Sequence, residues 1–217
     1  KAITRRPSAC VTRGLRSEDA DDPDFLQLER HHYEYVGALK AAGANVVELD
    51  PLENLPDAVF VEDTALCLPD CAILMRPGAE SRRPEVVPIA DDIRKIFRNV
   101  FEISGPGFIE GGDILYTGRE ILVGTSERTD LAGIAELAEF IEPRGYRVRP
   151  VETPPGVLHF KSDCSLVGTD TILSTKRLAT SGCFSEYTML VVPEGEEAAA
   201  NMIRFNNTLI MSVGFPK

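Results

Sequence analysis

The sequence contains no apolar run that approaches the roughly 20 residues of a transmembrane helix. Its opening residues, KAITRRPSAC, lack the apolar stretch of a signal peptide. The five cysteines form neither an even set nor a Cys-x-x-Cys pair, so a disulfide framework is not expected. These absences predict a soluble protein of the reducing cytoplasm with no membrane-spanning segment.

Clusters of basic residues are also absent. The 217 residues carry a formal net charge of −11, and no compact run of lysine and arginine offsets it. Such a chain would repel a phosphate backbone or an anionic membrane surface. Only three histidines occur, and two of them, His31 and His32, are adjacent on one expected helix, which argues against a histidine-rich zinc site. We expect no nucleic-acid partner, no metal, and a cationic or zwitterionic small molecule as ligand.

What the sequence does contain is an internal repeat. Hydrophobic residues make up 43% of the chain, which is enough for one sizeable core or at most two small domains, and no low-complexity linker divides residues 1–217. Glu62, Glu110 and His159 follow one another at intervals of 48 and 49 residues. Four segments share the pattern strand, turn, strand: AVFVEDTALCLPDCAILMRPG, GFIEGGDILYTGREILVGTS, GVLHFKSDCSLVGTDTILST and AANMIRFNNTLIMSVGFP.

Amphipathic helical patterns and short strands accompany the hairpins. The expected inward faces are Phe25, Leu28, His32, Val36 and Leu39 in helix 24–43, Ile89, Ile93, Ile96 and Phe97 in helix 85–99, and Leu131, Ile134, Leu137, Ala138 and Ile141 in helix 130–145. The expected short strands are 2–9, 44–50, 100–104 and 146–152. Hairpins inside and helices outside predict an α/β ring of ββαβ units whose first strands line a central channel.

The fourth hairpin is followed at once by MSVGFPK, with no helix and no further strand. A ring of this kind closes when one blade takes strands from both ends of the chain. We therefore expect a single domain over residues 1–217 that is truncated at the C-terminus and lacks its closing segment.

Acidic side chains stand among apolar strand residues in two of the repeats. A buried ionised carboxylate is costly unless a cation or a hydrogen-bond donor meets it. Strand alternation would bring Glu62 or Asp63 together with Glu110 and His159 at one mouth of the channel. Each acid could instead be a solvated strand end or a turn residue. Paired carboxylates match the fork of donors on a planar guanidinium, so a guanidino ligand fits better than a metal.

His159 lies in the apolar segment GVLHFKSD. It is either a packed core histidine or, because it repeats the position of Glu110, a general acid and base held by a carboxylate. None of the five cysteines is a good nucleophile: Cys164 follows His159 by an odd number of residues and would point to the opposite face of the strand.

Six motifs occur in order along the whole chain: LPDAVFVEDTAL, ILMRPGAESRR, FIEGGDIL, VGTSERTD, VLHFKSD and NMIRFNNTLIMSVGFPK. Together they resemble the dimethylarginine dimethylaminohydrolase family, penteins of the guanidino-group-modifying superfamily. The resemblance implies a five-bladed, pseudo-symmetric ββαβ propeller around a polar channel. It also implies hydrolysis of Nω-methylated L-arginine to L-citrulline and methylamine or dimethylamine, with no cofactor.

The resemblance further implies a role for each matching residue. His159 corresponds to the catalytic histidine and Glu110 to the acid that orients it. Asp63 corresponds to the carboxylate that holds the substrate guanidinium. The implied substrate-binding residues are Leu15 in a lid loop, Asp57, Glu62, Asp63 and, at the amino-acid end of the substrate, Arg82 and Arg128. We expect Arg82 and Arg128 to project toward the mouth that holds His159, because only then can both reach a carboxylate on the substrate.

The implied mechanism is covalent. A thiolate attacks the guanidinium carbon, His159 protonates the departing amine, and the same histidine then deprotonates the water that releases citrulline. The family nucleophile is a cysteine in a Gly-Gly-x-Ser-Cys-like segment near the C-terminus, and residues 1–217 contain no such segment. We therefore expect the nucleophile beyond Lys217, and residues 1–217 alone to be inactive.

Two alternatives stay open. An arginine deiminase or amidinotransferase of the same superfamily uses the same carboxylates and histidine with a different alkyl-amine pocket. A non-catalytic binding module, such as the ring-shaped translation initiation factor of similar architecture, is disfavoured by the acidic charge and the inward carboxylates. The sequence leaves undecided the oligomeric state, including a homodimer, and the preference between mono- and dimethyl substrates.

Overall fold

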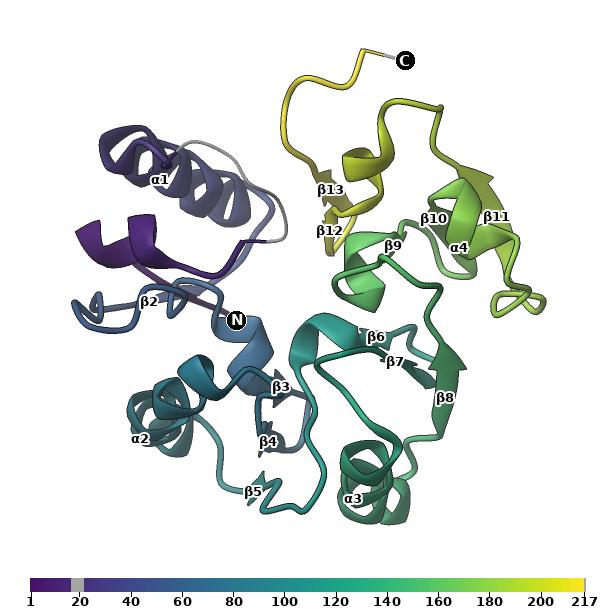
Figure 1. Ribbon diagram of the computed structural model, residues 1–217, viewed down its shortest axis with the longest axis horizontal. Helices are drawn as coiled ribbons and strands as arrows, with labels where there is room; N and C mark the ends of the chain where they lie inside the picture. The colour runs from purple at the N-terminus through teal and green to yellow at the C-terminus, as the bar shows by residue number, and fades with distance from the viewer. Residues whose placement is uncertain (17–21, 217) are drawn as a thin grey trace.

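The computed structural model describes residues 1–16 and 22–216, and its elements follow one another around a central point (Figure 1). Three complete units occur in this part of the chain, each an antiparallel hairpin, a helix, and a strand parallel to the second hairpin strand. The predicted ββαβ repeat is therefore confirmed. The units are β3 (Ala65–Cys67), β4 (Ala72–Leu74), α2 (Val86–Ile96) and β5 (Val100–Glu102); β6 (Ile114–Tyr116), β7 (Ile121–Thr125), α3 (Leu131–Ile141) and β8 (Val148–Glu152); and β9 (Cys164–Leu166), β10 (Thr171–Ser174), α4 (Lys176–Ala179) and β11 (Thr188–Val191).

Two partial units flank these three. The first contains β1 (Ala2–Arg5), α1 (Phe25–Ala41) and β2 (Val46–Leu49), with β1 and β2 parallel. The last contains the antiparallel strands β12 (Ile203–Phe205) and β13 (Thr208–Ile210). The two partial units lie side by side in Figure 1, and the Asn206 side chain donates a hydrogen bond to the Ala42 carbonyl at 2.9 Å. Contacts between the described ends of the chain thus bring the first and last units together.

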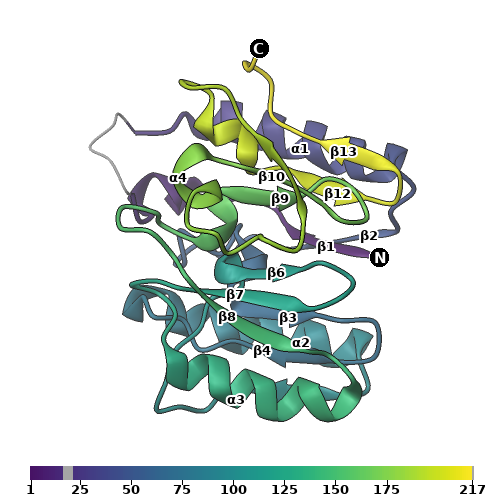
Figure 2. The ribbon, with the colours of Figure 1, turned by 90° about the vertical axis from the view of Figure 1, so that its right-hand side faces the viewer.

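The helices lie on the outside, with α1 and α3 at opposite edges and the strands between them (Figure 2). Asp24 caps α1 by accepting the backbone N–H groups of Leu26 and Gln27 at 2.9 and 3.2 Å. Asp130 caps α3 by accepting the N–H of Gly133 at 2.7 Å. No helix in the described ranges is both long and apolar enough to cross a membrane.

The second hairpin strands form the centre of the core. Residues 72–74 of β4 and 121–124 of β7 are buried without alternation, because a helix covers one face and the neighbouring unit covers the other. The predicted inward faces of α1 and α2 are buried or half-buried, but Leu131 of α3 is 64% exposed. The buried stripe of α3 begins two residues later, at Gly133, which leaves Leu131 at the open end of the helix.

Two elements of the third complete unit were not predicted. Helix α4 has only four residues, too few to show a helical period, and Thr175 caps it by accepting the N–H of Leu178. Strand β11 is mostly exposed and has no apolar alternation that would have indicated it.

The segments predicted as the start of each first hairpin strand are 3₁₀ turns instead. The turns are η2 (Val61–Thr64), η4 (Gly111–Asp113) and η6 (Phe160–Ser162), and each leads into β3, β6 or β9. Glu62 and Asp63 lie within η2, while Glu110 and His159 immediately precede η4 and η6. The predicted strand placement of these residues is therefore wrong, and their directions follow from turns rather than from strand alternation.

Candidate active site

The turns of the three complete units meet near the centre of the ring. There the polar atoms of Asp63, Glu110 and His159 lie within 4.8 Å of one another. His159 Nε2 is 2.8 Å from Glu110 Oε2, a direct hydrogen bond. The equal spacing of the repeats correctly predicted that Glu110 and His159 meet.

Two glycines allow the turns to approach so closely. A Cβ atom on Gly111 would lie 1.9 Å from the carbonyl oxygen of Glu62. A Cβ atom on Gly112 would lie 2.6 Å from Asp63 Oδ1 and 2.9 Å from His159 Cγ. The Gly-Gly pair is thus required by packing between units, because no other residue leaves room for the neighbouring turns.

The environment of His159 favours its protonated form. Burial alone would lower the pKa of the imidazole, but the hydrogen bond to Glu110 and the negative charges of Asp63 and Asp113 outweigh it, so the net shift is upward. Burial would likewise raise the pKa of Glu110, but its bonds to His159 and to the Ala79 N–H lower it overall. Both shifts favour an imidazolium next to a carboxylate.

Arg128 also reaches this cluster. Its Nη1 atom lies 3.6 Å from Glu110 Oε1, and its side chain is largely but not fully buried. The predicted projection of Arg128 toward the site agrees with the structure. An accessible guanidinium beside the cluster has the geometry needed to bind an anionic group of a ligand.

Arg82 also approaches the cluster, but it is buried and bound by internal acceptors. It is only 3% exposed, and its guanidinium donates to Asp63 Oδ2, to both carboxylate oxygens of Glu85, and to the carbonyls of Asp57 and Phe60. Arg82 therefore reaches the cluster through Asp63, but internal acceptors bind its Nε, Nη1 and Nη2 groups, and its contact with a substrate stays a prediction. This arrangement fixes the carboxylate of Asp63 instead.

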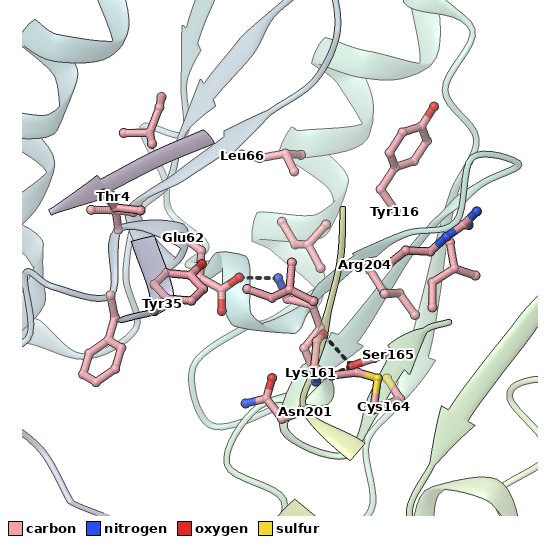
Figure 3. Close-up of a pocket in the computed structure, with 18 of the residues that line it drawn as sticks. Thr4, Tyr35, Glu62, Leu66, Tyr116, Lys161, Cys164, Ser165, Asn201 and Arg204 are labelled. Atoms are coloured by element: carbon pink, nitrogen blue, oxygen red, sulfur yellow. Dashed lines mark hydrogen bonds and ion pairs between the residues drawn. The ribbon is translucent and has the colours of Figure 1, made fainter. Parts of the chain in front are cut away.

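Glu62 lies next to Asp63 in sequence, but its carboxylate is not part of the cluster of Asp63, Glu110 and His159. Its side chain is 61% exposed and forms an ion pair with Lys161, whose Nζ lies 2.6 Å from Glu62 Oε2. Figure 3 shows the two side chains pointing toward one another at a cavity of about 780 Å³, which is lined also by Tyr35, Ser165 and Arg204. The lining of this large cavity does not include Asp63, Glu110 or His159. Of the two alternatives, Glu62 or Asp63, it is Asp63 whose carboxylate lies in the cluster, while the charge of His159 still acts on Glu62.

The predicted lid residue Leu15 is linked to Asp57. The backbone N–H of Leu15 donates to both carboxylate oxygens of Asp57 at 3.0 and 3.2 Å. Asp57 is buried, and burial raises the pKa of its carboxyl group despite that hydrogen bond. The Leu15 side chain is about half exposed. Asp57 therefore anchors the backbone of this segment.

Sequence reasoning missed the role of Asp113 and of the two hydroxyl groups that contact it. Asp113 Oδ2 accepts hydrogen bonds from Ser126 Oγ and Thr129 Oγ1, each at 2.7 Å. Its signal in the sequence is the recurrence of Asp63, Asp113 and Asp163 at intervals of 50 residues. Asp63 lies within η2, Asp113 ends η4 and Asp163 follows η6.

The cysteines of the described residues do not join the cluster of Asp63, Glu110 and His159. Cys164 is fully buried, its thiol donates to the Phe160 carbonyl at 3.3 Å, and burial raises its pKa well above the ordinary value. A thiol in this state is a poor nucleophile. Cys183 is partly buried, and burial raises its pKa as well.

A metal ion is not needed to explain why these acids lie together. The positive charges of Arg82, Arg128 and protonated His159 face the carboxylates of Asp63 and Glu110. The predicted absence of a metal and of a cofactor stays a prediction.

Comparison with known proteins gives relatives over the whole chain. A family model described as arginine deiminase matches residues 25–151. The N(G),N(G)-dimethylarginine dimethylaminohydrolases of Pseudomonas aeruginosa and Streptomyces coelicolor are 33% and 34% identical to this chain. The alignments cover 99% and 100% of this chain and 85% and 83% of those proteins.

Solved structures show the same likeness. The dimethylarginine dimethylaminohydrolase from Pseudomonas aeruginosa, as a cysteine-to-serine variant complexed with citrulline, matches with a TM-score of 0.95 over 99% of this chain and 84% of that chain, at 33% identity. The N-terminal domain of ArgZ, an arginine dihydrolase from cyanobacteria, matches with a TM-score of 0.86 over 98% of this chain and 83% of that chain. At 17% identity this second match concerns the fold alone.

Proposed function

The chain belongs to the dimethylarginine dimethylaminohydrolase family, and we propose that it hydrolyses Nω-methylated L-arginine to L-citrulline and methylamine or dimethylamine. The α/β pentein fold expected from the motifs is confirmed by the match to the citrulline complex. One observation carries the proposal: a hydrogen-bonded histidine and glutamate, His159 and Glu110, stand beside the fixed carboxylate of Asp63.

In the proposed reaction Asp63 binds the substrate guanidinium, and Arg82 and the Gly112 N–H hold that carboxylate in one orientation. A thiolate attacks the guanidinium carbon and forms a C–S bond. Protonated His159 gives its proton to the departing amine as the C–N bond breaks. Neutral His159 then takes a proton from a water molecule whose oxygen attacks the same carbon, the C–S bond breaks, and citrulline and the thiolate are released.

Glu110 has a supporting role in this scheme. Its carboxylate accepts the Nε2–H of His159, which leaves Nδ1 as the nitrogen that exchanges the proton with amine and water. The negative charge of Glu110 also stabilises the imidazolium that must be present at the first step.

The attacking thiolate is, in this proposal, none of the cysteines in residues 1–16 and 22–216. Cys164 is buried and bonded to a backbone carbonyl, and none of the described cysteines belongs to the cluster around His159. A thiol close to His159 and to the bound cation would have the lowered pKa that the attack requires.

For the amino-acid end of the substrate we propose Arg128 as the carboxylate-binding residue, with Leu15, anchored by Asp57, as part of the lid. Arg82 acts on Asp63 rather than on the substrate. Glu62 belongs to the ion pair with Lys161.

The function is tested with the protein expressed from its complete gene. Asymmetric dimethylarginine is the substrate, and citrulline and dimethylamine are quantified. We expect the two products in equal amounts, and a rate lower by roughly 10²- to 10⁴-fold in His159→Gln, because the proton carrier is lost. His31→Gln, at an exposed helix position, is the matched control and should keep the wild-type rate. A wild-type protein that forms no citrulline would overturn the proposal.

A second candidate, arginine deiminase activity, is favoured by the family model that matches residues 25–151. It predicts citrulline and ammonia from unmethylated arginine. The ratio of kcat/KM for arginine and dimethylarginine separates the two functions.

A cytoplasmic location is proposed from the composition alone. Light scattering will decide whether the protein forms a homodimer.

A further inference from the structure

Asp113 is a fully buried carboxylate that the proposed reaction does not use. Its Oδ1 atom accepts the backbone N–H of Phe160, the residue after His159, at 2.8 Å. Its Oδ2 atom accepts the hydroxyl groups of Ser126 and Thr129, each at 2.7 Å. Three donors from two other segments of the chain therefore converge on one carboxylate, as a buried polar group requires. Burial nevertheless raises the pKa of Asp113 above its ordinary value, although these bonds and the charge of His159 act in the opposite direction.

The two hydroxyl groups extend these bonds to further residues of the site. Thr129 Oγ1 accepts the backbone N–H of Glu110 at 3.0 Å. Ser126 Oγ accepts the backbone N–H of Arg128 at 2.9 Å. Each hydroxyl thus receives one hydrogen bond from a site residue and donates another to Asp113. Asp113 is directly linked to the segment of His159, and linked through one hydroxyl each to Glu110 and Arg128.

We propose that Asp113 is a positioning residue that sets the relative placement of His159, Glu110 and Arg128. The effect of Asp113 on catalysis rests on the proposed function. Its effect on the placement of the His159 imidazole does not, because that placement is a property of the fold.

Asp113 also acts on His159 through its charge. The charged groups that face the imidazole are Glu110 before η4, Asp113 at the end of η4, and Glu62 and Asp63 of η2. Burial lowers the pKa of His159, and Glu110, Asp63 and Asp113 together raise it above its ordinary value. Loss of the Asp113 charge should therefore lower the pKa of His159.

The substitution Asp113→Asn removes the negative charge of the side chain and keeps its shape. The amide oxygen still accepts the Phe160 N–H, and the amide N–H groups face two hydroxyl oxygens that can accept them. Asp163→Asn is the matched control. Asp163 occupies the equivalent position 50 residues later and is also buried. Its partners are Thr175 and Arg177, and it is not among the groups that shift the pKa of His159.

The experiment follows the imidazole resonances by NMR as a function of pH in the wild type and both variants. His159→Gln identifies the His159 resonance. We expect the titration midpoint of His159 to fall by about one pH unit in Asp113→Asn and to stay unchanged in Asp163→Asn. We also expect kcat for dimethylarginine to fall roughly 10- to 100-fold in Asp113→Asn, with a smaller change in KM, because the reacting groups are displaced.

Equal His159 midpoints in the wild type and Asp113→Asn would overturn the inference, as would an equal shift in Asp163→Asn. If the wild type forms no citrulline but the midpoint falls in Asp113→Asn, the proposed function fails and the positioning role stands. If Asp113→Asn does not fold, Thr129→Val and Thr129→Ser replace it. We expect the titration midpoint of His159 to move only in Thr129→Val, because this variant loses the hydroxyl group between Asp113 and Glu110. Identical midpoints in the two Thr129 variants would overturn the inference.

Discussion

The Asp63 carboxylate accepts the backbone N–H of Gly112 at 2.8 Å, so a side chain of one ββαβ unit is held by the turn of the next. Asp113 repeats this relationship with Phe160, also at 2.8 Å. The candidate site is therefore built from the contacts between units. Substitutions at these contacts should change stability and activity together.

Gly112→Ala should destabilise the protein by roughly 1–3 kcal/mol and remove activity. The added methyl group would meet Asp63 Oδ1 and the His159 ring at distances that real Cβ atoms do not adopt. Urea unfolding measures the loss. Gly37→Ala in α1 is the control: nothing lies within 4 Å of the added carbon, and we expect a gain of about 0.5–1 kcal/mol from reduced backbone freedom. Equal stability of Gly112→Ala and the wild type would contradict the packing argument.

Arg82→Ala should cost about 3–5 kcal/mol of stability, because it leaves the buried carboxylates of Asp63 and Glu85 without their cation. The neighbouring Arg83, whose side chain is partly exposed, provides the control, and Arg83→Ala should cost less than about 1 kcal/mol. Thermal or urea unfolding gives both values. A stable Arg82→Ala protein with a raised KM would instead return Arg82 to the substrate-binding residues.

Arg128→Lys should raise KM for dimethylarginine by roughly tenfold with little loss of stability. A lysine keeps the charge but cannot reproduce the fork of donors that a guanidinium offers to a carboxylate. Steady-state kinetics measure the change, with Arg119→Lys in the β6–β7 turn as control. A KM equal to that of the wild type would remove Arg128 from the substrate site.

The His159–Glu110 pair should make stability depend on pH within a defined window. The pKa of His159 is raised, so its contribution is complete below the ordinary value of 6.5 and is lost as pH rises through the folded-state pKa. The pKa of Glu110 is lowered, so its contribution is present above 4.5 and is lost as pH falls through its folded-state pKa.

The stability difference between the wild type and Glu110→Gln should therefore be largest between these two ordinary values. It should shrink as pH rises above 6.5 and as it falls below 4.5. Urea unfolding at a series of pH values checks this, and a difference that keeps growing in alkaline solution would show that the ion pair is not its source.

The repeat and its helices could be predicted from the sequence because their signals are local. Apolar residues at helical spacing place Ile89 and Ile93 on the buried face of α2, as observed. Units of nearly equal length fold alike, so the intervals between Glu62, Glu110 and His159 indicated that equivalent positions approach each other. That argument correctly paired Glu110 with His159.

The directions of individual side chains were decided by tertiary structure alone. Glu62 and Asp63 are adjacent, yet one pairs with Lys161, 99 residues away, and the other with Arg82. The local sequence around Arg82 is compatible with binding of a substrate carboxylate. In the folded protein, however, the side chain of Arg82 is buried and paired with Glu85. Within a 3₁₀ turn no simple alternation relates sequence to side-chain direction. The sequence by itself therefore determined the repeat and the chemical groups available to the site. Contacts between distant turns decided which carboxylate lies next to His159, because a buried charge can pair only with the groups that packing brings to it.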